Sequence, residues 1–194
     1  MLRIGITGGI GAGKTTISKC FVTLGVPVFN SDECAKQLVL NPVISAQIKT
    51  LLGNDSYTAG GTYNRPYISN IVFNDKEKLA QLNGIIHPAV AQAFDDFCTK
   101  NAHHKYVLKE SALLFETKMY QHLNATIVVI ANLETRIARV TQRDNSTATQ
   151  VQERINNQLS DTEKIKLANY VISNNNDSLV LEQILKIHTQ LMQD

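Results

Sequence analysis

A glycine-rich segment near the start of the chain has the residue types and the spacing of a phosphate-binding loop. Residues 8–15 read GGIGAGKT and match the pattern GxxxxGK followed by Ser or Thr at every fixed position. Glycines allow such a loop to turn so that successive backbone N–H groups point at phosphate oxygens. Lys14 would place a positive charge beside the β- and γ-phosphates, and the Thr15 hydroxyl would bind Mg²⁺. The pattern therefore predicts that the protein binds ATP and Mg²⁺.

The surroundings of this segment favour a nucleotide site over a glycine-rich turn that carries a lysine by chance. An apolar run at residues 2–7 precedes the loop, as a buried strand would, and a helical pattern follows it. The positive end of that helix would also attract phosphate. We expect the nucleotide to be bound by Gly9, Ile10, Gly11, Ala12, Gly13, Lys14, Thr15 and Thr16.

The loop alone does not distinguish a kinase from a GTP-dependent switch or a motor ATPase. GTP switches carry the motifs NKxD and DxxG, and neither occurs in this sequence. A length of 194 residues also disfavours the large ATPases. A kinase that acts on a small molecule is the favoured class, and a regulator that binds nucleotide without transferring phosphate is the alternative.

Three carboxylates follow apolar segments and are candidates for the chemistry. Asp32 follows a predicted strand, at the carboxyl edge where α/β sheets bind ligands, and is suited to accept the proton of an attacking hydroxyl. Capping of the next helix explains Asp32 equally well. Glu110 ends another predicted strand and would support the water shell of Mg²⁺, with an exposed pair to Lys109 as an equal alternative. Glu116 is, on the residues alone, more simply a surface carboxylate.

Three arginines, Arg136, Arg139 and Arg143, are spaced i, i+3, i+7 and therefore share one face of a predicted helix. Arg154 follows in the next helix, beyond a polar turn. Two short helices that carry arginines suit a lid over phosphates, because a guanidinium group makes paired bonds to phosphate oxygens. A solvated charged face is the alternative. Given the phosphate-binding loop, we favour phosphate binding for Arg139 and Arg143.

His87 and Pro88 interrupt a long helical stretch. Because proline fits the first turn of a helix, we expect Pro88 to begin a new helix and His87 to lie at the junction. A histidine that caps or fills this junction is the simpler explanation on the residues alone.

The predicted elements alternate in the manner of an α/β protein. Short runs rich in β-branched residues predict buried strands at residues 2–7, 26–29, 106–108, 126–131 and 170–173. Helical patterns cover residues 13–24, 76–86, 88–100, 134–143, 160–168 and 178–192. Gly25 stands where a helix should end, and Ser160 with Glu163 has the spacing of a capping box. We therefore expect a mainly parallel sheet with helices around it.

The middle of the chain departs from this alternation. It is helical with an interruption rich in Gly, Asn and Tyr at residues 53–64. We expect a single domain with a core of residues 1–41 and 104–194, a helical insertion of about residues 42–103, and a lid of about residues 139–158.

Composition sets limits on the class of protein. Hydrophobic residues make up 43% of the chain and charged residues 19%, which is the balance of a globular protein. A formal charge of +2 is too small to favour binding to nucleic acid or to an anionic membrane. The three cysteines form no CxxC pair, and no apolar run is long enough for a signal or a membrane span. We expect a cytoplasmic protein, monomeric or weakly self-associating, that binds neither nucleic acid nor membranes.

Several motifs, in order along the chain, resemble those of the dephospho-coenzyme A (dephospho-CoA) kinase family. They are ITGGIGAGKT at residues 6–15, Asp32 with residues 35–36, His87–Pro88, residues 113–116, residues 142–144 and residues 168–174. The resemblance implies transfer of the γ-phosphoryl group of ATP to the ribose 3′-hydroxyl of dephospho-CoA, giving CoA and ADP. It also implies a P-loop NTPase fold of three layers, with a five-stranded parallel sheet, a helical acceptor-binding insertion and a lid.

Matching positions imply a role for each candidate residue. The catalytic group would be Lys14, Asp32, Arg139 and Thr7, with Asp32 as the base and Thr7 holding the reacting phosphates. Arg143 and Asn174 would bind the nucleotide, Asn174 near the adenine. The acceptor would be bound by Asp32, Arg65, His87, Glu110 and Glu116.

The sequence departs from the family pattern at three places. Asn30 stands where the family usually has the first Asp of an Asp-x-Asp pair. Residues 110–114 read ESALL where the family has DIPLL, and Ser69 stands where an arginine is common. Another P-loop kinase, of the nucleoside monophosphate or shikimate type, is therefore the nearest alternative.

Overall fold

The computed structural model describes residues 1–175, 177 and 179–193. The chain divides into two compact units. One consists of Met1–Asn30 with Cys98–Asp194, and we call it the P-loop unit. The other is Ser31–Phe97, and we call it the helical unit.

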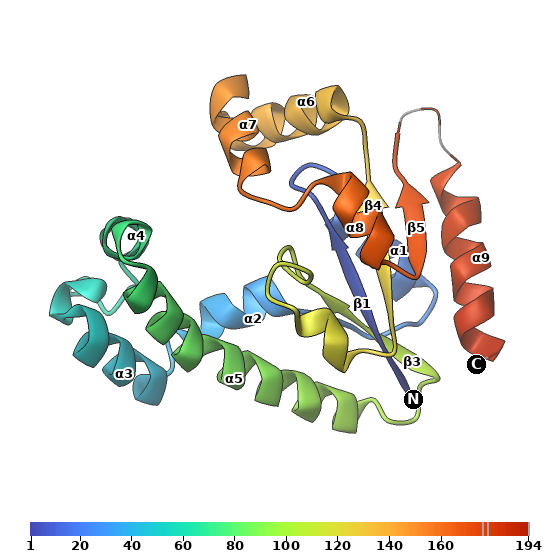
Figure 1. Cartoon of the computed structure of the whole chain (residues 1–194). Helices are drawn as coiled ribbons and strands as arrows, with labels where there is room; N and C mark the ends of the chain where they lie inside the picture. The colour runs from blue at the N-terminus through green and yellow to red at the C-terminus, as the bar shows by residue number, and fades with distance from the viewer. Residues whose placement is uncertain (176, 178, 194) are drawn as a thin grey trace. The chain divides into compact units, whose positions relative to one another are not determined.

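The P-loop unit is built on a parallel sheet of five strands (Figure 1). The strands are β1 (Leu2–Gly8), β2 (Val28–Asn30), β3 (Tyr106–Glu110), β4 (Ala125–Ile130) and β5 (Tyr170–Ser173). Their order across the sheet is β2-β3-β1-β4-β5, so the strand that leads into the glycine-rich loop is the central one. Every pairing is parallel, which confirms the α/β class and the five-stranded parallel sheet.

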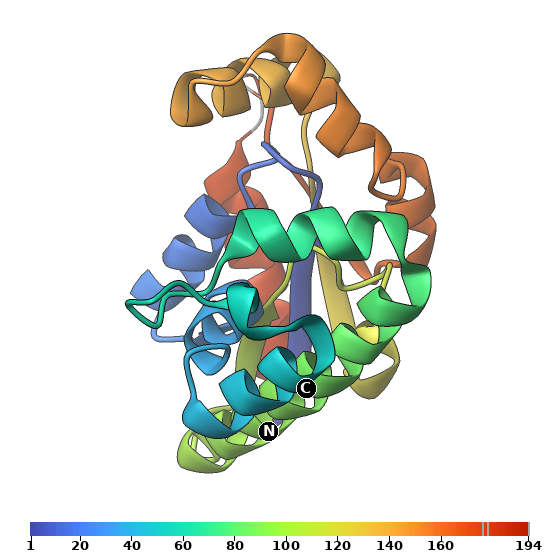
Figure 2. The same cartoon turned by 90° about the vertical axis from the view of Figure 1, so that its left-hand side faces the viewer.

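The helices of the P-loop unit are α1 (Lys14–Thr23), α6 (Leu133–Asp144), α7 (Ala148–Asn156), α8 (Asp161–Leu167) and α9 (Val180–Gln193), with a short 3₁₀ turn η2 (Met119–His122). Figures 1 and 2 show α1 and α9 on one face and α8 on the other, which makes three layers. Ile4, Ile6, Ile17, Phe21 and Ile184, each at most 1% exposed, belong to the core between the sheet and α1 with α9. The helix predicted at residues 178–192 is α9, and residue 178 lies outside the described residues.

Two local signals read from the sequence are confirmed. Gly25 follows the last residues of α1 with φ of 82°, a left-handed conformation that only glycine adopts without strain. Ser160 and Glu163 form a complete capping box at the start of α8, in which each side chain bonds to the backbone N–H of the other. The end of α1 and the start of α8 are therefore each determined by a few neighbouring residues.

The helical unit has its own hydrophobic core. Its helices are α2 (Ser31–Leu38), α3 (Pro42–Leu52), α4 (Arg65–Asn74) and α5 (Lys76–Lys100), with a short 3₁₀ turn η1 (Asn54–Ser56). Buried apolar side chains of α3, α4 and α5 pack together with Val39, which follows α2, and they include Ile44, Ile48, Ile68 and Leu82. Within the interruption rich in Gly, Asn and Tyr, Tyr57 pairs with Tyr63 and its hydroxyl donates to the carbonyl of Val39 at 2.6 Å.

The helical unit and the insertion expected from the sequence share residues 42–97. The unit begins earlier, at Ser31, so that α2 and Asp32 belong to it. In the described part of the chain no helix combines the length and the apolar character needed to cross a bilayer.

The prediction of a helix break at Pro88 is wrong. Helix α5 runs without interruption from Lys76 to Lys100 with Pro88 inside it. A proline within a helix removes the bond to the carbonyl of residue i−4 and crowds that residue, which here is Gly84. Gly84 has no side chain, and both residues are exposed, so water can reach the freed carbonyl. His87 therefore lies half-buried within a continuous helix and not at a junction.

Candidate active site

The glycine-rich loop connects the central strand β1 to helix α1. Gly11 and Gly13 have φ of 78° and 92°, values at which a side chain would strain the backbone. The Ala12 N–H donates to the Gly9 carbonyl at 3.0 Å, which closes a tight turn within the loop. Helix α1 begins at Lys14 directly after Gly13, so its positive N-terminal end faces the loop. The loop has the conformation that phosphate binding requires.

Glu110 joins the two reactive residues of the loop. Its Oε1 accepts a hydrogen bond from the Thr15 hydroxyl at 2.7 Å and lies 3.5 Å from the Lys14 Nζ. The carboxylate is 3% exposed, at the end of β3, which pairs with β1 in the sheet. A carboxylate that is buried to this extent needs such partners. The sheet register therefore brings Glu110, predicted from the end of another strand, to the two reactive residues of the loop.

The same group of residues suits Mg²⁺ chemically. The ion prefers oxygen ligands and is commonly held by one or two protein groups together with phosphate oxygens and water. The Thr15 hydroxyl and the Glu110 carboxylate supply hard oxygen atoms within one hydrogen bond of each other. Among the described residues no cluster of three His, Cys, Asp or Glu could hold a metal by itself, and a site completed by phosphates does not need one.

Asn174 and Arg139 meet at the other side of the loop. The Asn174 side-chain amide donates to the carbonyl of Ala12 at 2.8 Å, and Arg139 Nη2 donates to the carbonyl of Asn174 at 3.1 Å. Arg139 Nη1 is buried without a hydrogen-bond partner in the described part of the chain. A β-carbon built on Gly13 would lie 3.7 Å from this nitrogen, so the guanidinium group stands close to the loop. A buried cationic donor beside a phosphate-binding loop is suited to a phosphate oxygen.

Arg143 has a different environment. It makes two bonds to the neighbouring Asp144, at 2.7 and 3.1 Å, and Arg154 bonds the same carboxylate at 3.1 Å. The bond from Arg143 lowers the pKa of Asp144 and raises that of Arg143 itself. The Arg143 side chain is 63% exposed. The three arginines predicted to share a helix face thus have three different sets of partners.

Two residues bond to the loop although no sequence pattern predicts a contact between them and the loop. Arg136 Nε donates to the carbonyl of Ile10 at 2.9 Å, and the side-chain oxygen of Gln158 accepts from the Ile10 N–H at 2.9 Å. The sequence pattern singles out Arg136 only as one of three arginines on a helix face, and it does not single out Gln158. Both are more than 120 residues from Ile10, and no local pattern signals such a contact.

The surroundings of Thr7 and Glu116 could not be predicted from the sequence. The Thr7 side chain is fully buried within β1, and its hydroxyl has no hydrogen-bond partner among the described residues. Glu116 Oε1 accepts from the Leu159 N–H at 3.1 Å and lies 3.1 Å from the Nζ of Lys164, a lysine that is completely buried. These contacts give Glu116 a structural role in the P-loop unit.

The remaining candidates belong to the helical unit. Asp32 lies in the first turn of α2 and is exposed. Arg65 begins α4 and is exposed, and His87 is half-buried in α5. These residues come from three different helices.

Comparison with known proteins gives a consistent result. The family model described as dephospho-CoA kinase matches residues 2–179. The chain belongs to the dephospho-CoA kinase family. A dephospho-CoA kinase of Bacteroides fragilis (strain YCH46) is 36% identical over 193 residues, which are 99% of this chain and 94% of that protein. A dephospho-CoA kinase of Leptospira interrogans is 41% identical over 180 residues, covering 91% of this chain and 86% of the relative.

Solved structures agree with the fold. A crystal structure from Thermus thermophilus is 31% identical with a TM-score of 0.88, covering 97% of this chain and 96% of that one. The dephospho-CoA kinase from Campylobacter jejuni has a TM-score of 0.71 at 23% identity and coverage of 98% and 97%. Shikimate kinase from Acinetobacter baumannii is similar in fold alone, with a TM-score of 0.53 at 15% identity, covering 100% of this chain and 94% of that kinase. The P-loop kinase fold predicted from the sequence is confirmed.

Proposed function

We propose that the protein phosphorylates the ribose 3′-hydroxyl of dephospho-CoA with ATP, giving CoA and ADP. In this reaction the bond from the γ-phosphorus to the bridging oxygen of ADP breaks, and a bond from the ribose oxygen forms. The proton of the hydroxyl passes to a base. The observation that carries the proposal is the joining of Lys14 and Thr15 through Glu110, in a chain of the dephospho-CoA kinase family.

The loop residues and their neighbours would bind and orient the triphosphate. Backbone N–H groups of Gly11 and of residues 13–16, together with the Lys14 ammonium, would hold phosphate oxygens, with Gly9, Ile10 and Ala12 shaping the loop. Thr15 and Glu110 would hold Mg²⁺, which when bound neutralises charge on the β- and γ-phosphates. Arg139 would direct its unpaired Nη1 at a phosphate oxygen. Phosphoryl transfer needs mainly such positioning and charge.

The helical unit would supply the acceptor groups. Asp32 would take the hydroxyl proton, and Arg65 and His87 would bind the acceptor. Each assignment rests on its position in the family motifs, and each is a prediction. The further predictions that Glu116 contacts the acceptor and that Thr7 holds phosphates rest on the family motifs alone. Thr7 has a buried hydroxyl without a hydrogen-bond partner among the described residues.

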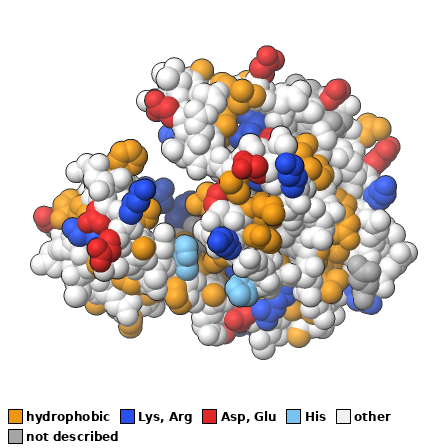
Figure 3. Space-filling model, in the orientation of Figure 1, with side chains coloured by type: hydrophobic (Ala, Val, Ile, Leu, Met, Phe, Trp, Pro, Cys, Tyr) orange, Lys and Arg blue, Asp and Glu red, His pale blue; other side chains and the backbone are white. Residues whose placement is uncertain are grey.

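The lid of about residues 139–158 would cover the nucleotide, with Arg143 released from Asp144 to reach it. On the face drawn in Figure 3, basic and acidic side chains of the P-loop unit are interspersed and do not gather into one basic surface. Action in the cytoplasm and a monomeric or weakly self-associating state stay predictions.

Mass spectrometry tests the proposal directly. Dephospho-CoA is incubated with ATP, Mg²⁺ and the protein, and the product is fragmented to locate the new phosphate. We expect a gain of one phosphate at the ribose 3′ position and release of ADP. Activity on nucleoside monophosphates or shikimate with none on dephospho-CoA would assign another acceptor. ATP binding without ADP formation on any acceptor would indicate a regulator.

A further inference from the structure

The peptide groups on both sides of Ile10 are held from outside the phosphate-binding loop. The Ile10 carbonyl accepts from Arg136 Nε at 2.9 Å, and the Ile10 N–H donates to Gln158 Oε1 at 2.9 Å. Arg136 comes from α6, and Gln158 from the segment between α7 and α8. Two distant parts of the chain thus fix one residue of the loop.

Arg136 is built into the structure and is not a surface charge. It is 6% exposed, and its Nη1 pairs with Asp161 Oδ2 at 3.1 Å. A β-carbon on Gly9 would collide with its guanidinium group, and one on Gly11 would come within 2.9 Å of its Cα. Gly9 and Gly11 therefore allow α6 to approach the loop closely, in addition to shaping the loop itself.

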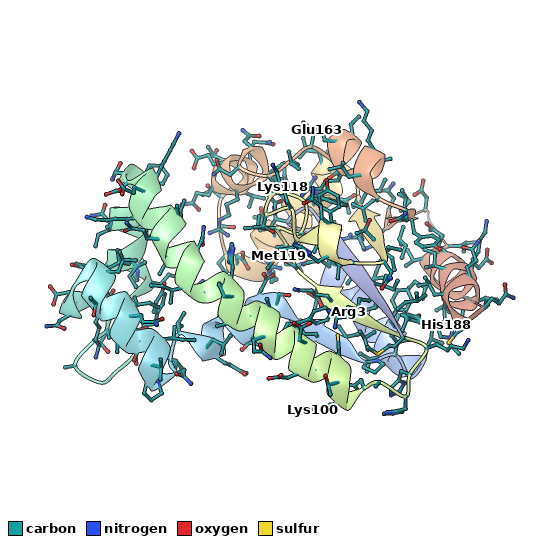
Figure 4. All side chains as sticks on the ribbon, turned by 60° about the horizontal axis from the view of Figure 1, so that its bottom comes forward. Arg3, Lys100, Lys118, Met119, Glu163 and His188 are labelled. Atoms are coloured by element: carbon teal, nitrogen blue, oxygen red, sulfur yellow. The ribbon has the colours of Figure 1, made fainter. Side chains whose placement is uncertain are left out.

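The segment that carries Gln158 is itself anchored on both sides. The Leu159 N–H donates to Glu116 at 3.1 Å, and the buried Lys164 lies 3.1 Å from the same carboxylate oxygen. The capping box of Ser160 and Glu163 fixes the start of α8. Figure 4 labels Glu163 on α8 and Lys118, two residues after Glu116, so that the two segments can be located. Gln158 therefore reaches Ile10 from a fixed backbone.

A fixed Ile10 has a consequence for binding. A loop that is already ordered loses little conformational entropy when a ligand arrives, so more of the interaction appears as affinity. Because the peptide groups of Ile10 are occupied by protein side chains, the amides that remain for phosphate begin at Gly11. Arg136 and Gln158 need not touch the nucleotide to affect how it binds.

We infer that Arg136 and Gln158 are positioning residues that hold the phosphate-binding loop in its binding conformation through Ile10. The inference deepens the proposed function and rests on it only in taking ATP as the ligand of the loop. The two residues act on ATP affinity, and they do so through the loop.

The test compares Gln158→Met with Gln158→Glu in the full chain. Methionine keeps the length of the side chain and removes the acceptor, whereas a carboxylate still accepts from the Ile10 N–H. We expect Gln158→Met to weaken ATP binding about tenfold, from the loss of one hydrogen bond to a group that stays inside the protein. Gln158→Glu should retain most of the affinity. The KM for the acceptor should not change in either variant.

The control is Gln190→Met, the same substitution at an exposed position of α9, outside the loop, the lid and the helical unit. It should leave ATP affinity unchanged. Arg136→Met combined with Asp161→Asn tests the other contact without leaving an unpaired carboxylate, and we expect a similar loss. Melting temperatures separate unfolding from loss of positioning, since a destabilised but folded variant should not change ATP affinity selectively.

Hydrogen exchange of the Ile10 amide in the ligand-free protein provides a readout that does not depend on activity. The amide should be protected in the parent protein and in Gln158→Glu, and should exchange faster in Gln158→Met. Faster exchange with unchanged ATP affinity, or no change in exchange, would overturn the inference. If the parent protein bound no ATP, the proposed function would fail while the exchange result would still report on the loop.

Discussion

The P-loop unit and the helical unit hold their candidate residues in different ways. In the P-loop unit, Glu110 contacts both Lys14 and Thr15, and Arg139 bonds to Asn174, which in turn bonds to the loop. In the helical unit, Asp32, Arg65 and His87 come from three helices, and the first two are exposed. Under the proposed function, the groups for phosphate are held by contacts with one another, whereas the groups for the acceptor are side chains presented by separate helices. The comparison predicts that variants in the two units will affect different kinetic parameters.

The largest effect is expected from Lys14→Ala. Loss of the ammonium group removes charge from the phosphates in both ground and transition states, so activity should fall by about 10³-fold or more. Steady-state kinetics with dephospho-CoA measure the loss of activity, and a calorimetric titration with ATP measures the loss of ATP affinity. Lys19→Ala, at an exposed position on the same helix, is the matched control and should behave as the parent. If Lys14→Ala were fully active, the loop would have no part in the phosphoryl transfer.

The next effect tests the helical unit. Asp32→Asn should lower kcat by about 10²-fold, because an amide cannot take the hydroxyl proton. ATP affinity should be retained, since phosphate binding belongs to the other unit. Glu33→Gln changes the neighbouring carboxylate in the same way and should have little effect. If Asp32→Asn retained full activity, Asp32 would not be the base and would be left with its place in the first turn of α2.

A smaller effect separates two arginines of α6. Arg139→Ala should weaken ATP binding about tenfold, because it removes a buried charged donor beside the loop. Arg143→Ala should weaken ATP binding by less, about threefold, since that side chain is exposed and must give up its bonds to Asp144 to reach the nucleotide. Fluorescence titration with a labelled nucleotide measures both. Unchanged affinity in Arg143→Ala would mean that Arg143 stays paired with Asp144 when the nucleotide binds.

The smallest effect concerns the core of the helical unit. Burial raises the pKa of Tyr57 to about 12, with a further contribution from Tyr63, against an ordinary value of 10.0. The folded state therefore keeps the phenol proton over a pH range in which the unfolded chain loses it. This contribution to stability is complete below pH 10.0 and is lost as pH rises towards about 12.

Tyr57→Phe should lower the free energy of unfolding by about 1 kcal/mol at pH 8, from the lost bond to the Val39 carbonyl. The difference from the parent should then shrink at higher pH, because the variant has no phenol to ionise. Urea unfolding followed by circular dichroism at pH 8 and pH 11 checks both statements. A constant difference across this range would contradict the assigned pKa.

Local patterns in the sequence predicted much of the fold and part of the site. The loop and its strand and helix, the glycine that ends α1 and the capping box of α8 each depend on residues within a few positions of one another. The contact of Glu110 with Lys14 and Thr15 depends on the register of β1 and β3, which no local sequence pattern specifies. The proximity of these residues could be expected only from a shared sheet edge.

Other features could not be predicted because their causes lie far apart in the chain or depend on exposure. The bonds of Arg136 and Gln158 to Ile10 span 126 and 148 residues. The sequence predicts that Pro88 begins a new helix, because the rule for proline does not consider that residue i−4 is an exposed glycine. Glu116 looked like a surface carboxylate because its partner, the buried Lys164, is 48 positions away and signals nothing locally.

The central place of β1 in the sheet has a consequence for how the protein is made. The strand and its loop are synthesised before their neighbours in the sheet, residues 106–110 and 125–130, and before Asn174, which bonds to the Ala12 carbonyl. Their contacts are therefore completed only after residue 174 has been synthesised. Ribosome-bound chains halted before residue 170 should not be retained on ATP-agarose, so that incomplete chains do not bind nucleotide.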